Sequence, residues 1–261
     1  MTTLVTTPVI EQIHRHASVR AYRAEPVARE MVETIIGAGQ RAATSSNLQA
    51  YAVIAVTDPA TKASIAHWCG DQAHIVAAPV FLAWCADLSK LDRATQLRNL
   101  PHSHECVESF LVAAVDAILA AQTATLAAES LGLGTCYIGG IRNNPRQIIE
   151  LLDLPKLMFP ITGMTLGWPS QPGTQRPRLP SEAVLHWERY STEGMDAALA
   201  EYDRAMAATG IYNNRQAPAS APGKPAKMEE YGWLEHCARR VSRPTRVGLR
   251  EALREQGFML E

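Results

Sequence analysis

The chain has 261 residues and a mass of 28.5 kDa, and its 25 basic and 26 acidic side chains leave a net charge of −1. A hydrophobic content of 47% excludes a disordered chain, and the balanced charge argues against a nucleic-acid partner. The sequence also shows no signal-peptide pattern and no uninterrupted apolar run of membrane-spanning length. We therefore expect a soluble, cytoplasmic protein with one large or two small domains and no membrane partner.

The first third of the chain predicts two helices and two buried strands. A helix is expected over residues 9–16, and Pro26 begins a second, amphipathic one whose apolar residues recur at helical spacing. Two apolar runs of strand length, residues 51–57 and 79–85, then predict buried strands.

The segment over residues 106–131 is the clearest helix in the sequence. It is rich in alanine and leucine, contains no glycine or proline, and ends before Gly132. Apolar residues occupy nearly its whole circumference, so we expect a central, buried helix. A membrane helix is the alternative, and Asp116, Gln122 and Glu129 argue against it because they interrupt the apolar run.

The remainder of the main domain predicts strands at residues 135–138 and 161–168, with a helix over residues 143–152 between them. A loop rich in proline and glycine follows over residues 169–180. Strands separated by helices indicate an α/β or an α+β domain.

The composition changes after Ser181. Polar helices are predicted around residues 195–208, then a Pro/Ala/Gly/Lys stretch over 216–227, then an amphipathic segment over 229–256. This part contains too little apolar material for a separate core, so we expect a lid docked on the main domain.

The cysteines predict neither disulfides nor a zinc site. There are five, widely spaced, and no two form a Cys-x-x-Cys pair. The segment His102-Ser-His104-Glu-Cys106 contains metal-binding residue types, but no second cluster lies at a suitable spacing. We therefore predict reduced thiols and no metal.

Four clusters of polar residues or glycines interrupt the apolar elements. They are His16 to Arg20, Thr44 to Asn47, Tyr137 to Gly140, and Gln175 to Arg178. Arginine, histidine and hydroxyl groups bind phosphate through charge-assisted hydrogen bonds, and glycines let backbone amides approach a ligand closely. The combination predicts a site for a phosphorylated planar ligand. For each cluster alone, the alternative is a solvated face without a ligand.

The order of these clusters resembles the FMN-dependent nitroreductase family, in its branch of oxygen-insensitive NADPH nitroreductase A and NADPH:flavin oxidoreductase. The matching motifs are His16-x-Ser18-x-Arg20, Thr44-Ser-Ser-Asn-Leu-Gln49, Gly70-x-Gln72, Tyr137-Ile-Gly-Gly140, Leu166-Gly-Trp-Pro169, Arg176-Pro-Arg178, Tyr212-Asn-Asn-Arg215 and Ser242-Arg-Pro244. The resemblance therefore covers nearly the whole chain.

The resemblance implies an α+β fold with a mixed, mainly antiparallel sheet wrapped by helices. It also implies an intertwined homodimer, with FMN at each of two subunit interfaces and the helix from Cys106 at the dimer centre. Residues 1–180 would form the FMN-binding core. Residues 181–261 would form a lid and a C-terminal segment docked on the core and on the partner subunit, within a single domain overall.

The resemblance also implies a set of cofactor-binding residues. The implied FMN-binding residues are His16, Ala17, Ser18, Arg20, Thr44, Gln72, Tyr137, Ile138, Gly139, Gly140, Arg176 and Arg178. Arg20 would lie beside flavin N1 and O2 and stabilise the anionic reduced flavin. Ala17 replaces an arginine that is common in the family, which removes one possible phosphate contact.

The electron donor implied by the resemblance is NADPH, with NADH as a possible donor. The implied donor or substrate residues are Ser46, Asn47, Arg215 and Arg243, and Arg243 is the candidate for the 2′-phosphate. The mobile-loop arginine of close relatives has no counterpart here, since its position falls near Gly210. Arg215 is the candidate to replace it.

Taken together, the resemblance implies an FMN-dependent NAD(P)H oxidoreductase that acts by ping-pong, two-electron hydride transfer. Nitroaromatics, quinones and flavins are the expected electron-poor acceptors. FMN carries the chemistry, so no catalytic side chain is assigned, and Arg20 acts electrostatically. Two alternatives stay open: a non-catalytic flavin-binding or carrier protein, and a different enzyme on the same scaffold.

Overall fold

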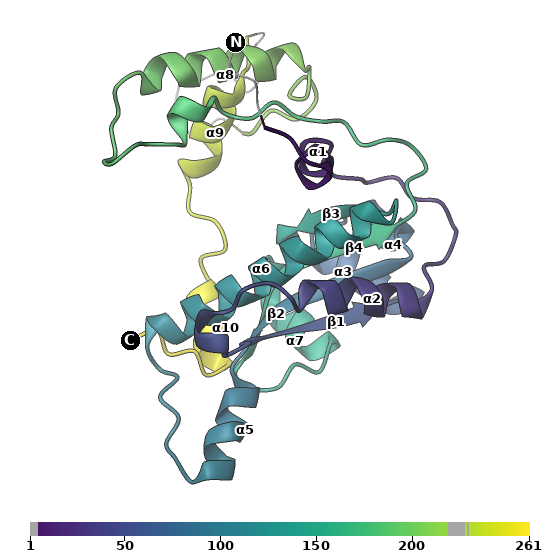
Figure 1. The fold of residues 1–261 in the computed structure, drawn as a ribbon, viewed down its shortest axis with the longest axis vertical. Helices are drawn as coiled ribbons and strands as arrows, with labels where there is room; N and C mark the ends of the chain where they lie inside the picture. Colours follow the sequence, from purple (N-terminus) through teal and green to yellow (C-terminus); the bar gives the residue numbers. More distant parts are fainter. Residues whose placement is uncertain (1–4, 219–227, 229) are drawn as a thin grey trace. The chain divides into compact units, whose positions relative to one another are not determined.

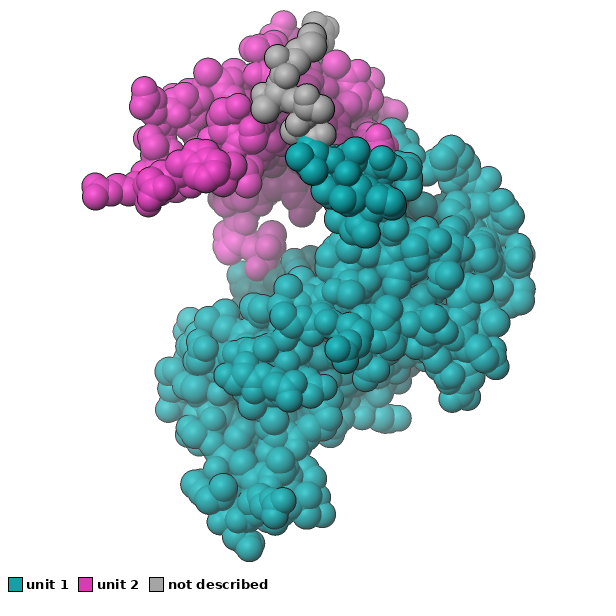
Figure 2. All heavy atoms as spheres, in the orientation of Figure 1, with its two compact units in different colours: residues 1–174, 246–261 teal, residues 175–245 magenta. Residues whose placement is uncertain are grey.

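A computed structural model describes residues 5–218, 228 and 230–261. The chain divides into two compact units, coloured separately in Figure 2. The first unit comprises residues 1–174 and 246–261, and the second comprises residues 175–245. Most of the predicted Pro/Ala/Gly/Lys stretch lies outside the described residues.

The first unit contains a four-stranded sheet with the strand order β1-β2-β4-β3. Its strands are β1 (Tyr51–Val56), β2 (Val80–Asp87), β3 (Gly134–Ile138) and β4 (Met158–Gly167). All pairs of neighbouring strands are antiparallel. The α+β class is therefore confirmed. The prediction of a mixed sheet was wrong for the described residues, because each strand pairs only with antiparallel neighbours.

Helices cover both faces of the sheet (Figure 1). The core on one face contains residues from α2 (Arg29–Gly39), α6 (Val107–Ser130) and α10 (Leu249–Glu255). The core on the other face contains residues from α3 (Pro59–Trp68), α4 (Ala73–Ala77) and α7 (Pro145–Leu151). Successive β2 residues point to alternate faces, so Trp84 joins the first core and Phe81 the second.

The long helix α6 matches the predicted helix to within one residue at each end. Its length and apolar composition would suffice for a membrane span, but one side of the helix is part of the core. The buried side is a stripe of small residues: Ala113, Ala117, Ala120, Ala121, Ala124 and Ala128. The prediction of a helix buried all round was wrong for this chain alone, because a second side exposes Val107, Leu111, Val115, Ile118 and Leu119.

Helices α2 and α6 pack with their backbones unusually close. A Cβ placed on Gly39 would lie 3.0 Å from the Ala120 carbonyl oxygen and 3.1 Å from the Ala124 Cβ. Glycine at the end of α2 and alanine along α6 therefore permit this approach.

Several helices of the first unit were not predicted. They are α3, α4 and α5 (Ser89–Arg98). Helix α3 has a recognisable start, because Asp58 Oδ2 accepts the Thr61 N–H at 2.7 Å and proline follows Asp58. The first helix of the chain, α1 (Pro8–His14), is capped by the Thr7 hydroxyl.

The second unit contains α8 (Met195–Ala208) and α9 (Trp233–Val241). It has a small core of its own, made of Tyr202, Met206, Tyr212 and Tyr231, which the composition did not lead us to expect. The predicted amphipathic segment 229–256 consists of two helices, α9 and α10, separated by a turn that contains Pro244. The role of residues 181–261 as a lid stays a prediction.

Candidate functional site

An irregular segment, residues 16–20, runs beside β3, which is an edge strand of the sheet. The Val19 N–H donates to the Thr135 carbonyl oxygen at 2.8 Å, so backbone pairing holds this segment to the strand. Burial raises the pKa of the Cys136 thiol on β3, and the positive charge of Arg20 and the hydroxyl of Ser18 oppose that rise. Ser18 and Arg20 therefore lie next to β3.

Tyr22 fastens the same segment to the sheet. Its hydroxyl donates to the Val19 carbonyl at 2.7 Å and lies 2.7 Å from Thr165 Oγ1 on β4. Burial raises the pKa of Tyr22 far above its ordinary value, so the phenol stays a hydrogen-bond donor. The segment is thereby tied to two strands.

His16 contacts the end of α6. Its Nδ1 lies 2.5 Å from Glu129 Oε1, and the side chain of Glu129 is only 13% exposed. The second Glu129 oxygen has no hydrogen-bond partner in the described part of the chain. A ligand of His16 would therefore meet the other ring nitrogen.

Gln72 and Gly140 are brought together at the end of β3. Gln72 Nε2 donates to the Cys69 carbonyl at 2.8 Å. A Cβ on Gly140 would lie 2.5 Å from that carbonyl oxygen and 2.6 Å from Gln72 Nε2, so this contact requires glycine. We call His16, Ser18, Arg20, Gln72, Gly139 and Gly140 the β3-edge group.

Tyr137 and Ile138 direct their side chains into the protein. The Thr125 hydroxyl of α6 donates to the Tyr137 hydroxyl at 3.1 Å, and Ile138 is 1% exposed. Burial raises the pKa of Tyr137. Any ligand at this strand end would therefore meet backbone atoms of these two residues.

The predicted residues Thr44, Ser46 and Asn47 lie on a separate turn, which we call the Thr44 turn (residues 44–49). Three of its residues, none of them glycine, have left-handed backbone, with φ of 47° at Ser46, 57° at Asn47 and 51° at Gln49. Such backbone costs roughly 1–2 kcal/mol per residue, and less for asparagine. Residues 45–49 are exposed.

Asp116 of α6 holds this turn and was missed as a site residue by the sequence analysis. The carboxylate accepts the Ser45 N–H at 3.0 Å and the Ala50 N–H at 3.1 Å. The available signal was a single acidic residue in an apolar helix, and it was interpreted only as evidence against a membrane span.

The four predicted arginines of the second unit occupy loops. Arg178 is exposed and donates to the carbonyls of Arg176 and Pro177. Arg215 is the last residue of a turn, which its N–H closes by donating to the Tyr212 carbonyl at 3.1 Å. Arg243 is exposed in the turn after α9.

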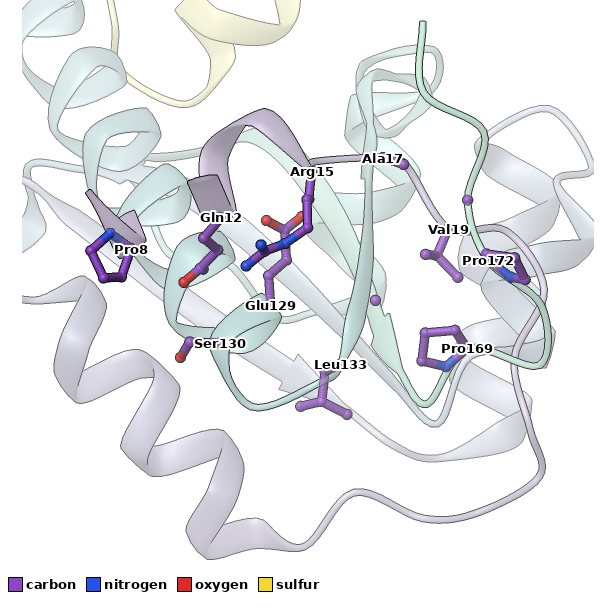
Figure 3. Close-up of a pocket in the computed structure, with 12 residues that line it drawn as sticks. Pro8, Gln12, Arg15, Ala17, Val19, Glu129, Ser130, Leu133, Pro169 and Pro172 are labelled. Carbon is purple, nitrogen blue, oxygen red and sulfur yellow. The ribbon is translucent and has the colours of Figure 1, made fainter. Parts of the chain in front are cut away.

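A cavity of about 470 Å³ lies in the first unit among α1, the end of α6 and the loop after β4. In Figure 3 the side chains of Arg15 and Glu129 reach toward each other at this cavity. Ala17 is the one predicted FMN-binding residue among those lining it. In the described part of the chain, no group of three His, Cys, Asp or Glu side chains is arranged to hold a metal ion.

Comparison with known proteins finds one family along almost the whole chain. Residues 13–168 match the nitroreductase family, and residues 176–261 match the nitroreductase family C-terminal domain. The chain is 41% identical over 259 residues to an FMN reductase [NAD(P)H] of Bacillus subtilis, covering 97% of this chain and 98% of that protein.

Two further relatives span similar lengths. An oxygen-insensitive NADPH nitroreductase of Salmonella typhimurium is 35% identical, covering 96% of this chain and 98% of that protein. The structure of the NADPH:FMN oxidoreductase of Vibrio harveyi complexed with NAD⁺ is similar with a TM-score of 0.83. That protein is 32% identical, and the match covers 97% of this chain and 99% of the other.

Proposed function

The chain belongs to the nitroreductase family, and we propose that it is an FMN-dependent NAD(P)H oxidoreductase that reduces flavins and nitro compounds. The observation that carries the proposal is the edge of β3, where the bond from the Val19 N–H to the Thr135 carbonyl places the neighbouring Ser18 and Arg20 along the strand. Relatives of matching length, named as FMN reductase and NADPH nitroreductase, supply the class of reaction.

The β3-edge group fits a flavin mononucleotide by its chemistry. The ligand carries a phosphate and several ring acceptors, and the group offers a guanidinium, an imidazole, a hydroxyl and an amide as donors. A Cβ on Gly139 would lie 3.5 Å from its nearest neighbour, an Arg142 nitrogen, which is ordinary van der Waals contact, so this residue is not crowded as Gly140 is. These features support FMN as the resident cofactor.

In this proposal the residues of the chain bind FMN and the nicotinamide donor and hold them in orientation. FMN, when bound, supplies two-electron transfer from a reduced nicotinamide to an electron-poor acceptor. Arg20 would hold a positive charge beside the ring edge, and His16 and Ser18 would bind the phosphate and ribityl end. The family resemblance adds Arg176 and Arg178 as phosphate contacts, and Thr44 and Gln72 as contacts of the polar ring atoms.

We assign the nicotinamide donor to Ser46, Asn47, Arg215 and Arg243. NADPH is the donor we expect, because a guanidinium at Arg243 suits a 2′-phosphate. NADH is the alternative donor, and both nitroaromatics and quinones are expected acceptors.

The exposed apolar side of α6 supports a homodimer. Its five residues fall on one side of the helix, because Val107, Leu111 and Val115 follow one another at a spacing of four and Ile118 and Leu119 lie three and four residues after Val115. Each of the five is at least 42% exposed. An apolar stripe of this length on a soluble enzyme marks an interaction surface. We propose that two copies pair there and that each flavin site uses residues of both subunits. We also propose that the protein is cytoplasmic.

The visible spectrum of the purified protein tests this function. We expect flavin absorption bands that NADPH bleaches faster than NADH, and that a quinone or nitroaromatic restores. A protein that carries flavin and is not bleached by either nucleotide would be a flavin carrier. A colourless protein that takes up no FMN would contradict the proposal.

A further inference from the structure

Asp116 is a fully buried carboxylate in an otherwise apolar part of α6, at 0% exposure. A buried carboxylate is costly unless hydrogen bonds compensate for its lost hydration. Within the described residues it takes part in no ion pair, and its partners are two backbone N–H groups. The compensation therefore comes from the Thr44 turn.

The two bonds bracket that turn. Oδ1 accepts the N–H of Ser45, at the start of the turn, and Oδ2 accepts the N–H of Ala50, directly after it. Between these two points, three residues with side chains keep positive φ. Within the turn, the Leu48 N–H also donates to the Ser45 carbonyl at 2.9 Å. A single carboxylate thus clamps both ends of an exposed, strained segment.

We infer that Asp116 is a positioning residue for the nicotinamide donor, because it holds Ser46 and Asn47 in place. The inference rests on the proposed function, which assigns those two residues to the donor. It adds a role for a residue that lies inside a helix and is fully buried. Without the clamp, the exposed turn would relax toward ordinary backbone and lose the arrangement of its side chains.

The test uses Asp116→Asn in the full-length, flavin-loaded protein. An amide of the same shape has one oxygen to accept an N–H, and its NH₂ group would face the other donor, so one bond is lost. We expect the KM for NADPH to rise about tenfold while kcat changes less than about threefold. Hydrogen exchange of peptides covering residues 43–52, followed by mass spectrometry, should be at least about tenfold faster than in the wild type.

Asp87→Asn is the matched control. Asp87 is also buried, at 4% exposure, and its carboxylate also accepts a backbone N–H, from Ser89 at 2.9 Å. Its own N–H donates to the Ala50 carbonyl at 3.0 Å, a backbone bond that the substitution leaves in place, and its side chain makes no hydrogen bond to residues 44–49. We expect this variant to lower thermal stability while leaving the KM for NADPH and exchange in the turn unchanged.

Each outcome decides the inference. An unchanged KM, unchanged exchange in the turn, or equal effects in Asp116→Asn and Asp87→Asn would overturn it. A wild-type protein that oxidises no NADPH would contradict the proposed function separately. In that case faster exchange in Asp116→Asn would still support the clamp, and retained protection would overturn it.

Discussion

The β3-edge group and the Thr44 turn are held in place by different means. Residues 16–20 are held by backbone pairing with an edge strand, through the 2.8 Å bond from Val19 to Thr135, and by the Tyr22 hydroxyl. The Thr44 turn has left-handed backbone and is held by one carboxylate on a helix. The first arrangement spreads its support over several groups, whereas in the second one side chain accepts the N–H bonds at both ends, beside backbone bonds from Leu48 to Ser45 and from Asp87 to Ala50.

This difference shows where substitutions should act. A segment paired with a strand tolerates loss of one contact, because neighbouring contacts remain. A turn with one anchor loses its arrangement when that anchor changes. Both elements also depend on α6, since Glu129 at its end contacts His16 and Asp116 at its middle clamps the turn.

Leu111→Glu tests whether the β3-edge group and the Thr44 turn belong to a site that two subunits form together. Leu111 is 50% exposed on the apolar side of α6. A carboxylate buried in a subunit interface costs several kcal/mol, so we expect monomers in light scattering and a roughly 100-fold loss of NADPH oxidation. Leu97→Glu, at a 64% exposed position on α5, is the control. Full activity from a monomeric variant would show that each chain holds a complete site.

Arg20→Ala removes the charge from the β3-edge group. We expect reduction of the flavin by NADPH, followed by stopped-flow absorbance, to slow by roughly 10- to 100-fold, because the guanidinium would stabilise the negative charge of the reduced flavin. The flavin reduction potential should fall as well. Arg23→Ala is the matched control, since Arg23 is exposed and donates to the Pro169 carbonyl. Equal reduction rates in the two variants would remove the role of Arg20.

Gly140→Ala tests the close contact at the end of β3. The new methyl would meet the Cys69 carbonyl at 2.5 Å and Gln72 Nε2 at 2.6 Å, so we expect a loss of about 1–3 kcal/mol in the free energy of unfolding. FMN affinity, measured by quenching of flavin fluorescence, should weaken too. Gly37→Ala has open space around its Cβ position and should be slightly stabilising. An unperturbed Gly140→Ala would contradict the packing argument.

Tyr22→Phe should have the smallest effect, because Val19 keeps its own bond to β3. Loss of the hydroxyl removes the bond to the Val19 carbonyl, which is worth about 0.5–1.5 kcal/mol. Urea denaturation measures this loss, and flavin reduction should change less than about threefold. Tyr190→Phe, at a 73% exposed position, should leave the unfolding midpoint unchanged. A large loss of activity in Tyr22→Phe would mean that the segment depends on a single anchor after all.

The sequence predicted much of the fold because the relevant signals were local. Helix α6 followed from an uninterrupted run of helix-forming residues, and the four strands followed from apolar runs of strand length. Helix α3 was not predicted although Asp58 and Pro59 form a helix start, because only the apolar run of residues 51–57 before them was assigned to an element.

The parts of the candidate site that were not predictable depend on contacts distant in sequence. Asp116 lies 66 residues from Ala50, and nothing in either segment indicates that they meet. The exposed apolar side of α6 was also hidden, because alanines on one side and larger residues on the other look alike in a composition count. Gln72 and Gly140, by contrast, were predicted as site residues from motifs and lie in contact.

The contact between Gly39 and the alanine stripe of α6 limits how this protein can change over evolutionary time. Glycine and alanine are the two smallest residues, so almost every substitution at these positions adds atoms, and even a single Cβ on Gly39 would lie only 3.0 Å from the Ala120 carbonyl oxygen. Overpacking of this kind costs about 1–3 kcal/mol, and here it would also displace the helix that leads into the Thr44 turn. A library that seeks a changed preference for the nicotinamide donor should therefore leave these positions alone and vary the exposed residues of the turn.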